Sequence, residues 1–109
     1  MGRTIEGVAL RRGHTITHRI DVENRHELAQ LCRETTDAVI EFTHADSVLD
    51  TLAQLIPTRV PLVVGTTGWY SQLERVAERV YEHESTLVYA PNFSIGVVLM
   101  FRLNRLLAQ

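Results

Sequence analysis

The chain has 109 residues, of which 45% are hydrophobic and 22% are charged, so it is expected to fold as one soluble domain or part of one. A formal net charge of −2 argues against nucleic-acid binding, and no apolar run approaches the roughly 20 residues of a membrane span. The single cysteine, Cys32, excludes a disulfide framework and a cysteine-rich zinc site and favours a cytoplasmic location. No histidine pair has zinc-site spacing either, so no metal is expected.

The hydrophobic pattern predicts short strands that alternate with helices. Helices are predicted at residues 3–12, 24–33, 46–56, 71–83 and 95–108, and strands at residues 14–20, 38–41, 62–64 and 86–89. Gly13 is expected to end the first helix, Ser94 to cap the last, and Ser71 with Glu74 to form a capping box. This order predicts an α/β fold with a parallel sheet covered by helices on both faces. Because the chain opens inside a helix, the first strand of that sheet is expected to be missing.

Short turn segments rich in Gly, Thr, Ser and Asn, with one acid, follow the predicted strands. They are Asp21, Phe42 and Thr43, then Gly65 to Gly68, then Ala90 to Ser94. Ligands of parallel sheets bind outside the carboxyl ends of the strands, which all lie along one edge. Strand-to-helix turns use Gly, Thr, Ser and Asn for structural reasons alone, so each single turn has a purely structural alternative. Four such turns at one edge favour a binding site.

Asp21 has a specific role available at this edge. A carboxylate at the end of the second strand can accept two hydrogen bonds from a ribose diol, about 20 residues after a glycine-rich nucleotide loop of which Gly2 would be the last glycine. Such a carboxylate repels the 2′-phosphate of NADP and favours NAD, although Arg19 and Arg25 are close enough in sequence to offset that repulsion. The alternative is an acid exposed in an ordinary turn.

Three motifs in this order resemble the 4-hydroxy-tetrahydrodipicolinate reductase (dihydrodipicolinate reductase) family of lysine and diaminopimelate biosynthesis. They are Val-Ile-Glu-Phe-Thr at 39–43, Val-Val-Gly-Thr-Thr-Gly at 63–68, and Tyr-Ala-Pro-Asn-Phe-Ser-Ile-Gly-Val at 89–97. The resemblance implies a Rossmann-like domain that binds NADH or NADPH, a small-molecule substrate and a homotetramer in the complete protein.

The resemblance also implies roles for individual residues. Asp21 matches the ribose acid, and Phe42 and Thr43 match positions beside the nicotinamide ribose. Gly65, Thr66 and Thr67 match the loop around the nicotinamide, with Thr67 nearest the substrate. A second cofactor loop is matched by Ala90, Pro91, Asn92 and Phe93.

The family's catalytic motif, a His-His pair followed by Lys and an Asp-Ala-Pro-Ser-Gly-Thr run, is absent from this sequence. We therefore expect a partial dinucleotide-binding domain at residues 1–94. Residues 95–109 would begin the helix that leads into an absent substrate and tetramerisation domain, and the catalytic residues would lie beyond Gln109. The piece alone should be inactive.

Two alternatives are a non-catalytic nucleotide-binding or interaction module derived from that family, and another dinucleotide enzyme such as a semialdehyde dehydrogenase. The lack of a cysteine nucleophile site counts against the latter.

Overall fold

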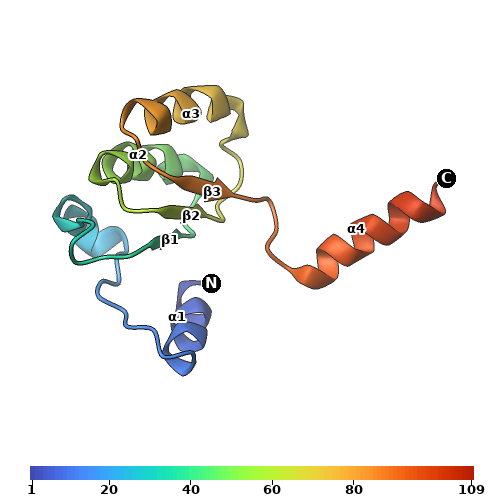
Figure 1. Ribbon diagram of the computed structural model, residues 1–109, viewed down its shortest axis with the longest axis horizontal. Helices are drawn as coiled ribbons and strands as arrows, with labels where there is room; N and C mark the ends of the chain where they lie inside the picture. Colours follow the sequence, from blue (N-terminus) through green and yellow to red (C-terminus); the bar gives the residue numbers. More distant parts are fainter.

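Three short strands form a parallel sheet in the order β1–β2–β3 (Figure 1). The computed structural model describes residues 1–109. The strands are β1 (Val39–Glu41), β2 (Leu62–Val64) and β3 (Leu87–Tyr89). Val39 is paired with Leu62, and Leu62 with Leu87, so all three strands end level at the same edge of the sheet. This arrangement confirms the three predicted strands in the middle and later part of the chain and their parallel direction.

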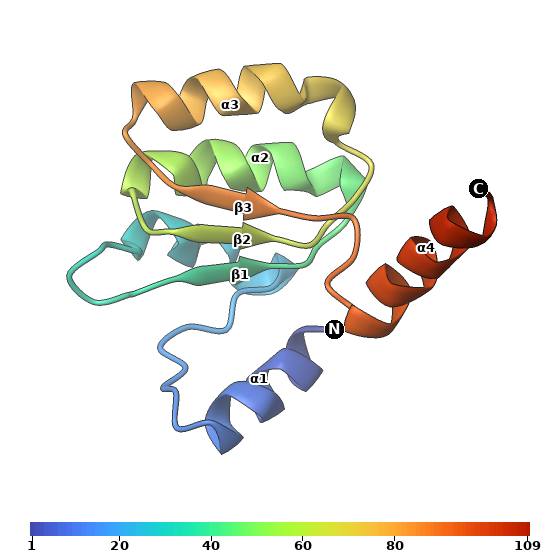
Figure 2. The same ribbon diagram turned by 45° about the vertical axis from the view of Figure 1, so that its right-hand side comes forward.

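Helices lie on both sides of this sheet, as predicted, but only one face is well covered (Figure 2). The α-helices are α1 (Gly2–Arg11), α2 (Ala45–Leu55), α3 (Leu73–Glu82) and α4 (Ile95–Leu107), and the 3₁₀ helices are η1 (Val22–Gln30), η2 (Ile56–Thr58) and η3 (Tyr70–Gln72). Figure 2 shows α2 and α3 together over one face, α1 below the opposite face, and α4 projecting away from the sheet. The result is a Rossmann-like α/β arrangement with one well-covered face.

The core lies between the sheet and α2. Val48, Leu52 and Leu55 recur at helical spacing and are buried against Leu62 and Val64 of the central strand. Burial of each such side chain stabilises the fold by about 1.5–3 kcal/mol relative to leaving it exposed. Alternation along β2 directs these two residues to the same face, which explains why a strand of three residues is held firmly in place.

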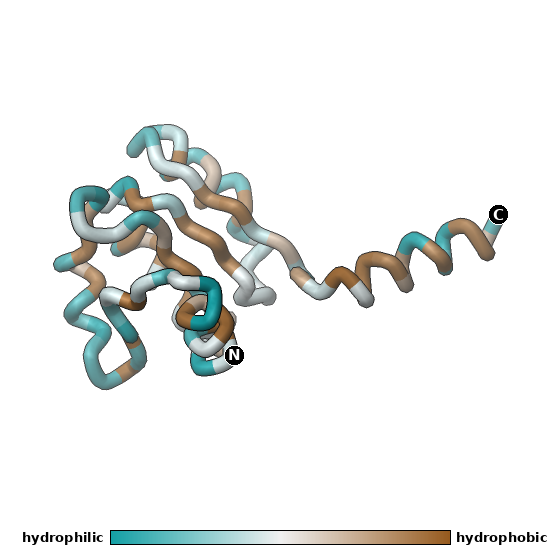
Figure 3. The backbone as a smooth tube through the Cα atoms, turned by 60° about the horizontal axis from the view of Figure 1, so that its bottom comes forward, coloured by the Kyte–Doolittle hydropathy of each residue, from teal (hydrophilic) through white to brown (hydrophobic).

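The opposite face and α4 leave apolar side chains exposed. Ile40 and Val88 are 52% and 54% exposed on the side that faces α1. Along α4 no residue is buried, although most of its length is hydrophobic, as Figure 3 shows. A helix that is apolar around most of its circumference normally packs inside a larger structure. No helix of this chain is long and apolar enough to cross a membrane.

The predicted strand at residues 14–20 does not form; this segment is an irregular connection between α1 and η1. Its backbone bonds to no neighbouring strand, and His14 donates only to Ala9 of the preceding helix. A strand needs a partner to satisfy its N–H and C=O groups, and β1 pairs only with β2. The alternating pattern of residues 14–20 was therefore insufficient by itself. Gly13, with φ of +83°, does end α1 as predicted.

Two further local predictions are corrected. The helix predicted at 24–33 is instead the 3₁₀ helix η1, which ends at Gln30; Leu28 within it and Leu31 directly after it are both in the core. The predicted capping box of Ser71 and Glu74 is absent, because the turn η3 begins before it and Gln72 is the residue that precedes α3. Ser94 does cap α4, where its hydroxyl accepts a hydrogen bond from the Val97 N–H.

Candidate functional site

Three loops meet where the parallel strands end. They follow β1, β2 and β3 and contain the residues that the sequence predicted for cofactor binding, apart from Asp21. Because α2, α3 and α4 each follow one of these strands, their N-termini also lie at this edge, where unpaired N–H groups and the helix dipoles favour negative charge. In Figure 2 the N-terminus of α1 also lies toward the end of the sheet where the strands finish.

Phe42 connects the three loops. A Cβ added to Gly65 would lie 2.0 Å from Cε1 of the Phe42 ring, so only glycine allows the two loops to approach this closely. The Phe42 ring also meets the Phe93 ring edge to face, with 6.4 Å between the ring centroids. Phe93 is 48% exposed, so this pair presents apolar surface at the sheet edge. The structure thus brings together Phe42, Gly65 and Phe93 as predicted.

The hydroxyl groups of Thr43 and Thr66 are joined through Glu41. The Thr66 hydroxyl donates to Glu41 Oε2 at 2.8 Å, and the Thr43 hydroxyl donates to Glu41 Oε1. The Thr43 N–H in turn donates to Thr66 Oγ1 at 2.7 Å. Glu41 and Thr66 are buried at 4% and 6% exposure, whereas Thr43 is exposed. The predicted Thr66 hydroxyl is therefore buried inside the protein, whereas the Thr43 hydroxyl, which also bonds to Glu41, belongs to an exposed residue.

Glu41 is the functional-site residue that sequence reasoning missed. By sequence it is assigned only to the end of a predicted strand, whereas the alternation of β1 places it on the same face as Val39, toward the core. An acid at an inward-facing position was the signal that could have identified it, because a buried carboxylate needs hydrogen-bond donors.

Trp69 anchors the loop after β2. Its indole N–H donates to the Thr66 carbonyl at 2.7 Å, and its side chain is 1% exposed. The ring packs edge to face against Tyr70 and Tyr89, so Trp69 belongs to the core rather than to a ligand-facing surface. Burial raises the pKa of Tyr70 above its ordinary value. Thr67 lies between these anchors, is exposed, and forms no side-chain hydrogen bond within the chain.

The third loop carries Ala90, Pro91 and Asn92 from β3 into α4. The Asn92 side-chain oxygen accepts a hydrogen bond from the Ser94 N–H at 2.6 Å, which shapes the turn before the helix. Its amide nitrogen forms no hydrogen bond within the chain and remains free to donate. Pro91 is exposed, and Ala90 is half-buried. The loop therefore offers one free amide donor beside the Phe93 ring.

Asp21 forms local contacts only. Its carboxylate accepts from the Val22 N–H at 2.7 Å, and its own N–H donates to Asn24, in a reciprocal cap of η1. Arg19 pairs with Glu6 of α1, which lowers the pKa of Glu6 because the guanidinium donates to its carboxylate. Arg25 donates to the Ser47 carbonyl and the Thr51 hydroxyl of α2. Both arginine side chains are therefore already bonded to other residues of this chain.

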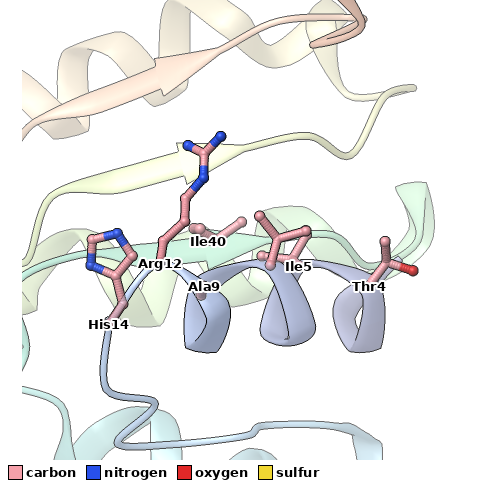
Figure 4. A pocket seen from close by; sticks show the side chains of 7 residues that line it. Thr4, Ile5, Ala9, Arg12, His14 and Ile40 are labelled. Carbon is pink, nitrogen blue, oxygen red and sulfur yellow. The ribbon is translucent and has the colours of Figure 1, made fainter.

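An open apolar groove lies apart from these loops, between α1 and the outer side of β1. Figure 4 shows Ile5 and Ala9 beside Ile40, with Arg12 and His14 at one end. None of the predicted site residues lines it. In the whole chain, no three His, Cys, Asp or Glu side chains gather in a way that could hold a metal ion.

The chain resembles one family of known proteins. The family described as dihydrodipicolinate reductase, N-terminus, matches residues 2–93. A 4-hydroxy-tetrahydrodipicolinate reductase of Christiangramia forsetii is 34% identical over 110 residues, which cover 99% of this chain and 44% of that protein. Proteins of the same name from Mycobacterium marinum and Mycobacterium ulcerans are 41% identical over 86 residues, or 77% of this chain and 35% of each relative. The chain spans less than half the length of these relatives. No solved structure matches it.

Proposed function

The chain belongs to the dihydrodipicolinate reductase family, and from this premise we propose that it is the cofactor-binding part of an NAD(P)H-dependent reductase that converts 4-hydroxy-tetrahydrodipicolinate to tetrahydrodipicolinate. The observation that carries the proposal is the contact of three strand-end loops around Phe42, which lies against both Gly65 and Phe93. Such a meeting of loops at the carboxyl edge of a parallel sheet is the usual place for a dinucleotide.

The residues at this edge fit a reduced nicotinamide nucleotide. The half-buried Phe42 ring and the exposed Phe93 ring suit its apolar ring faces, while Thr43, Thr67 and the free amide of Asn92 suit its ribose and carboxamide groups. The first turn of α1 holds no acid, which suits a diphosphate at its positive end. The nucleotide, when bound, supplies a hydride. This chain's part is to bind it, orient it and leave one ring face open to substrate.

We infer that the nucleotide is preferentially NADH. NADP carries a 2′-phosphate that proteins usually meet with a free arginine. The two arginines nearest Asp21 in sequence are occupied, Arg19 with Glu6 and Arg25 with α2. The Asp21 carboxylate accepts from the backbone N–H groups of Val22 and Asn24, and its remaining lone pairs could accept from a ribose hydroxyl. This arrangement favours a diol over a phosphate.

The proposal extends to a longer protein. Residues 1–94 would be a nucleotide-binding domain, and residues 95–109 the start of a helix that enters a substrate and tetramerisation domain carrying the catalytic residues. A further strand would pair with the free edge of β1, fill the groove beside Ile5 and Ile40, and give residues 14–20 a partner. The exposed apolar surface of α4 supports a covering domain. The single cysteine supports a cytoplasmic location.

Titration of the complete protein with NADH and NADPH, followed by a reduction assay with 4-hydroxy-tetrahydrodipicolinate, tests this proposal. NADH is expected to bind and to be oxidised by substrate. Nucleotide binding without turnover would instead support the non-catalytic module.

The preference for NADH has its own test. Asp21→Ala should weaken NADH binding more than NADPH binding, because only the ribose diol loses a partner. Asp37→Ala, which removes another exposed acid, serves as the control. An equal loss for both nucleotides would exclude Asp21 from the site.

A further inference from the structure

A buried carboxylate, that of Glu41, lies beneath the loops and accepts hydrogen bonds from two threonine hydroxyls. A threonine hydroxyl has one hydrogen to donate, and Thr43 and Thr66 both donate theirs to Glu41. Thr66 also accepts from the Thr43 N–H, so its hydroxyl is engaged in both directions. Thr43, which is exposed, is left with lone pairs and no free hydrogen on its outer side.

We propose that Glu41 is a positioning residue that fixes Thr43 as a hydrogen-bond acceptor, so that the ligand group at this position must be a donor. This inference rests on the proposed function for the identity of the ligand. In a reduced nicotinamide nucleotide two groups have that chemistry, the carboxamide N–H₂ and a ribose hydroxyl. A carbonyl or phosphate oxygen at this position would meet another acceptor and be rejected.

Burial makes this assignment of roles rigid. Glu41 is 4% exposed, and its two oxygens each receive one hydroxyl hydrogen. Reversing the Thr43 hydroxyl would withdraw a donor from a buried carboxylate, which is costly because water cannot replace it. Cofactor recognition is therefore coupled to a residue that does not itself face the ligand.

Glu41→Gln is the sharpest test, because it keeps the size of the side chain and replaces one acceptor oxygen with an N–H₂ donor. Since Thr66 already accepts from Thr43, the amide oxygen is expected to face Thr66 and the N–H₂ group to face Thr43. The Thr43 hydroxyl then accepts from Gln and turns its hydrogen outward. NADH binding by the complete protein should weaken on the order of 10-fold, as expected for a lost hydrogen bond. Glu41→Asp keeps both acceptor oxygens and should bind much more like the wild type.

Thr43 variants isolate the predicted acceptor. Thr43→Val should weaken NADH binding to a similar extent, Thr43→Ser should not, and the double variant with Glu41→Gln should be no weaker than either single variant. If Glu41→Gln does not fold, the Val and Ser variants decide the question alone. Repeating the titration with the 3-acetylpyridine analogue of NADH, which lacks the amide hydrogens, separates the two donors. Loss of the Thr43→Val effect would identify the carboxamide, and its persistence a ribose hydroxyl.

The overturning results are distinct from failure of the proposed function. A folded Glu41→Gln protein that binds NADH as tightly as the wild type overturns the inference and leaves the function in place. So does equal NADH binding by Thr43→Val and Thr43→Ser, or full additivity in the double variant. A wild-type protein that binds no NADH overturns both. A melting curve for every variant distinguishes lost positioning from lost folding.

Discussion

Gly65→Ala is expected to break the connection between the three site loops. The new Cβ would lie 2.0 Å from Phe42 Cε1 and 2.1 Å from Cζ, whereas ordinary contacts begin at 3.4 Å, so the ring must retreat by more than an ångström. That movement would also disturb the edge-to-face contact between the Phe42 and Phe93 rings. Forced overpacking costs about 1–3 kcal/mol, and a lost aromatic pair about 0.5–1.5 kcal/mol. Because Phe42 is only partly buried, we expect a loss of roughly 1–2 kcal/mol, the lower part of the overpacking range.

Denaturant unfolding and NADH titration of the same protein measure this effect. Gly7→Ala is the matched control, since its Cβ would meet only the flexible end of Arg11, at 3.5 Å, and alanine favours the helix. Phe42→Ala added to Gly65→Ala should recover part of the lost stability but not the NADH binding. Unchanged stability and NADH affinity in Gly65→Ala would refute the reasoning, as would a failure of Phe42→Ala to relieve the strain.

Three other perturbations test separate contacts. Trp69→Phe removes the N–H that bonds to Thr66 and also leaves part of the buried indole volume empty, so it should lower the free energy of unfolding by more than the roughly 1 kcal/mol of the hydrogen bond; an unchanged unfolding midpoint would count against this anchor. Glu6 has a pKa lowered by Arg19, so its contribution to stability is present above its unfolded pKa of about 4.3 and should disappear as the pH falls through the lower folded value. An NMR titration would detect this, and a Glu6→Gln protein with the same acid profile would contradict it. The chain of residues 1–109 should self-associate through α4, and deletion of residues 95–109 should reduce this in sedimentation velocity; a monomer at all concentrations would argue otherwise.

The local sequence pattern was sufficient to predict the positions of the three strands, of α2 and of the loops that follow the strands. Val48, Leu52 and Leu55 repeat at a helical period, and the apolar run at Leu62–Val64 is stopped by Gly65. These signals depend on neighbours within a few residues, so they can be read without knowing the partner surface. The same holds for Gly13 at the end of α1 and for Ser94 at the start of α4.

Other features of the fold and of the site depend on contacts between residues that are far apart in the sequence. Residues 14–20 alternate like a strand, but a strand exists only where another backbone can pair with it, and none does here. Cofactor binding by Asp21 stays a prediction, because the structure shows only its local cap of η1. Glu41 became part of the site because the pairing of β1 with β2 turned it toward Thr66, 25 residues later in the chain. The sequence alone thus determined which segments are apolar and where they turn. Tertiary structure decided which polar atoms are buried together, since that depends on contacts between residues far apart in the chain.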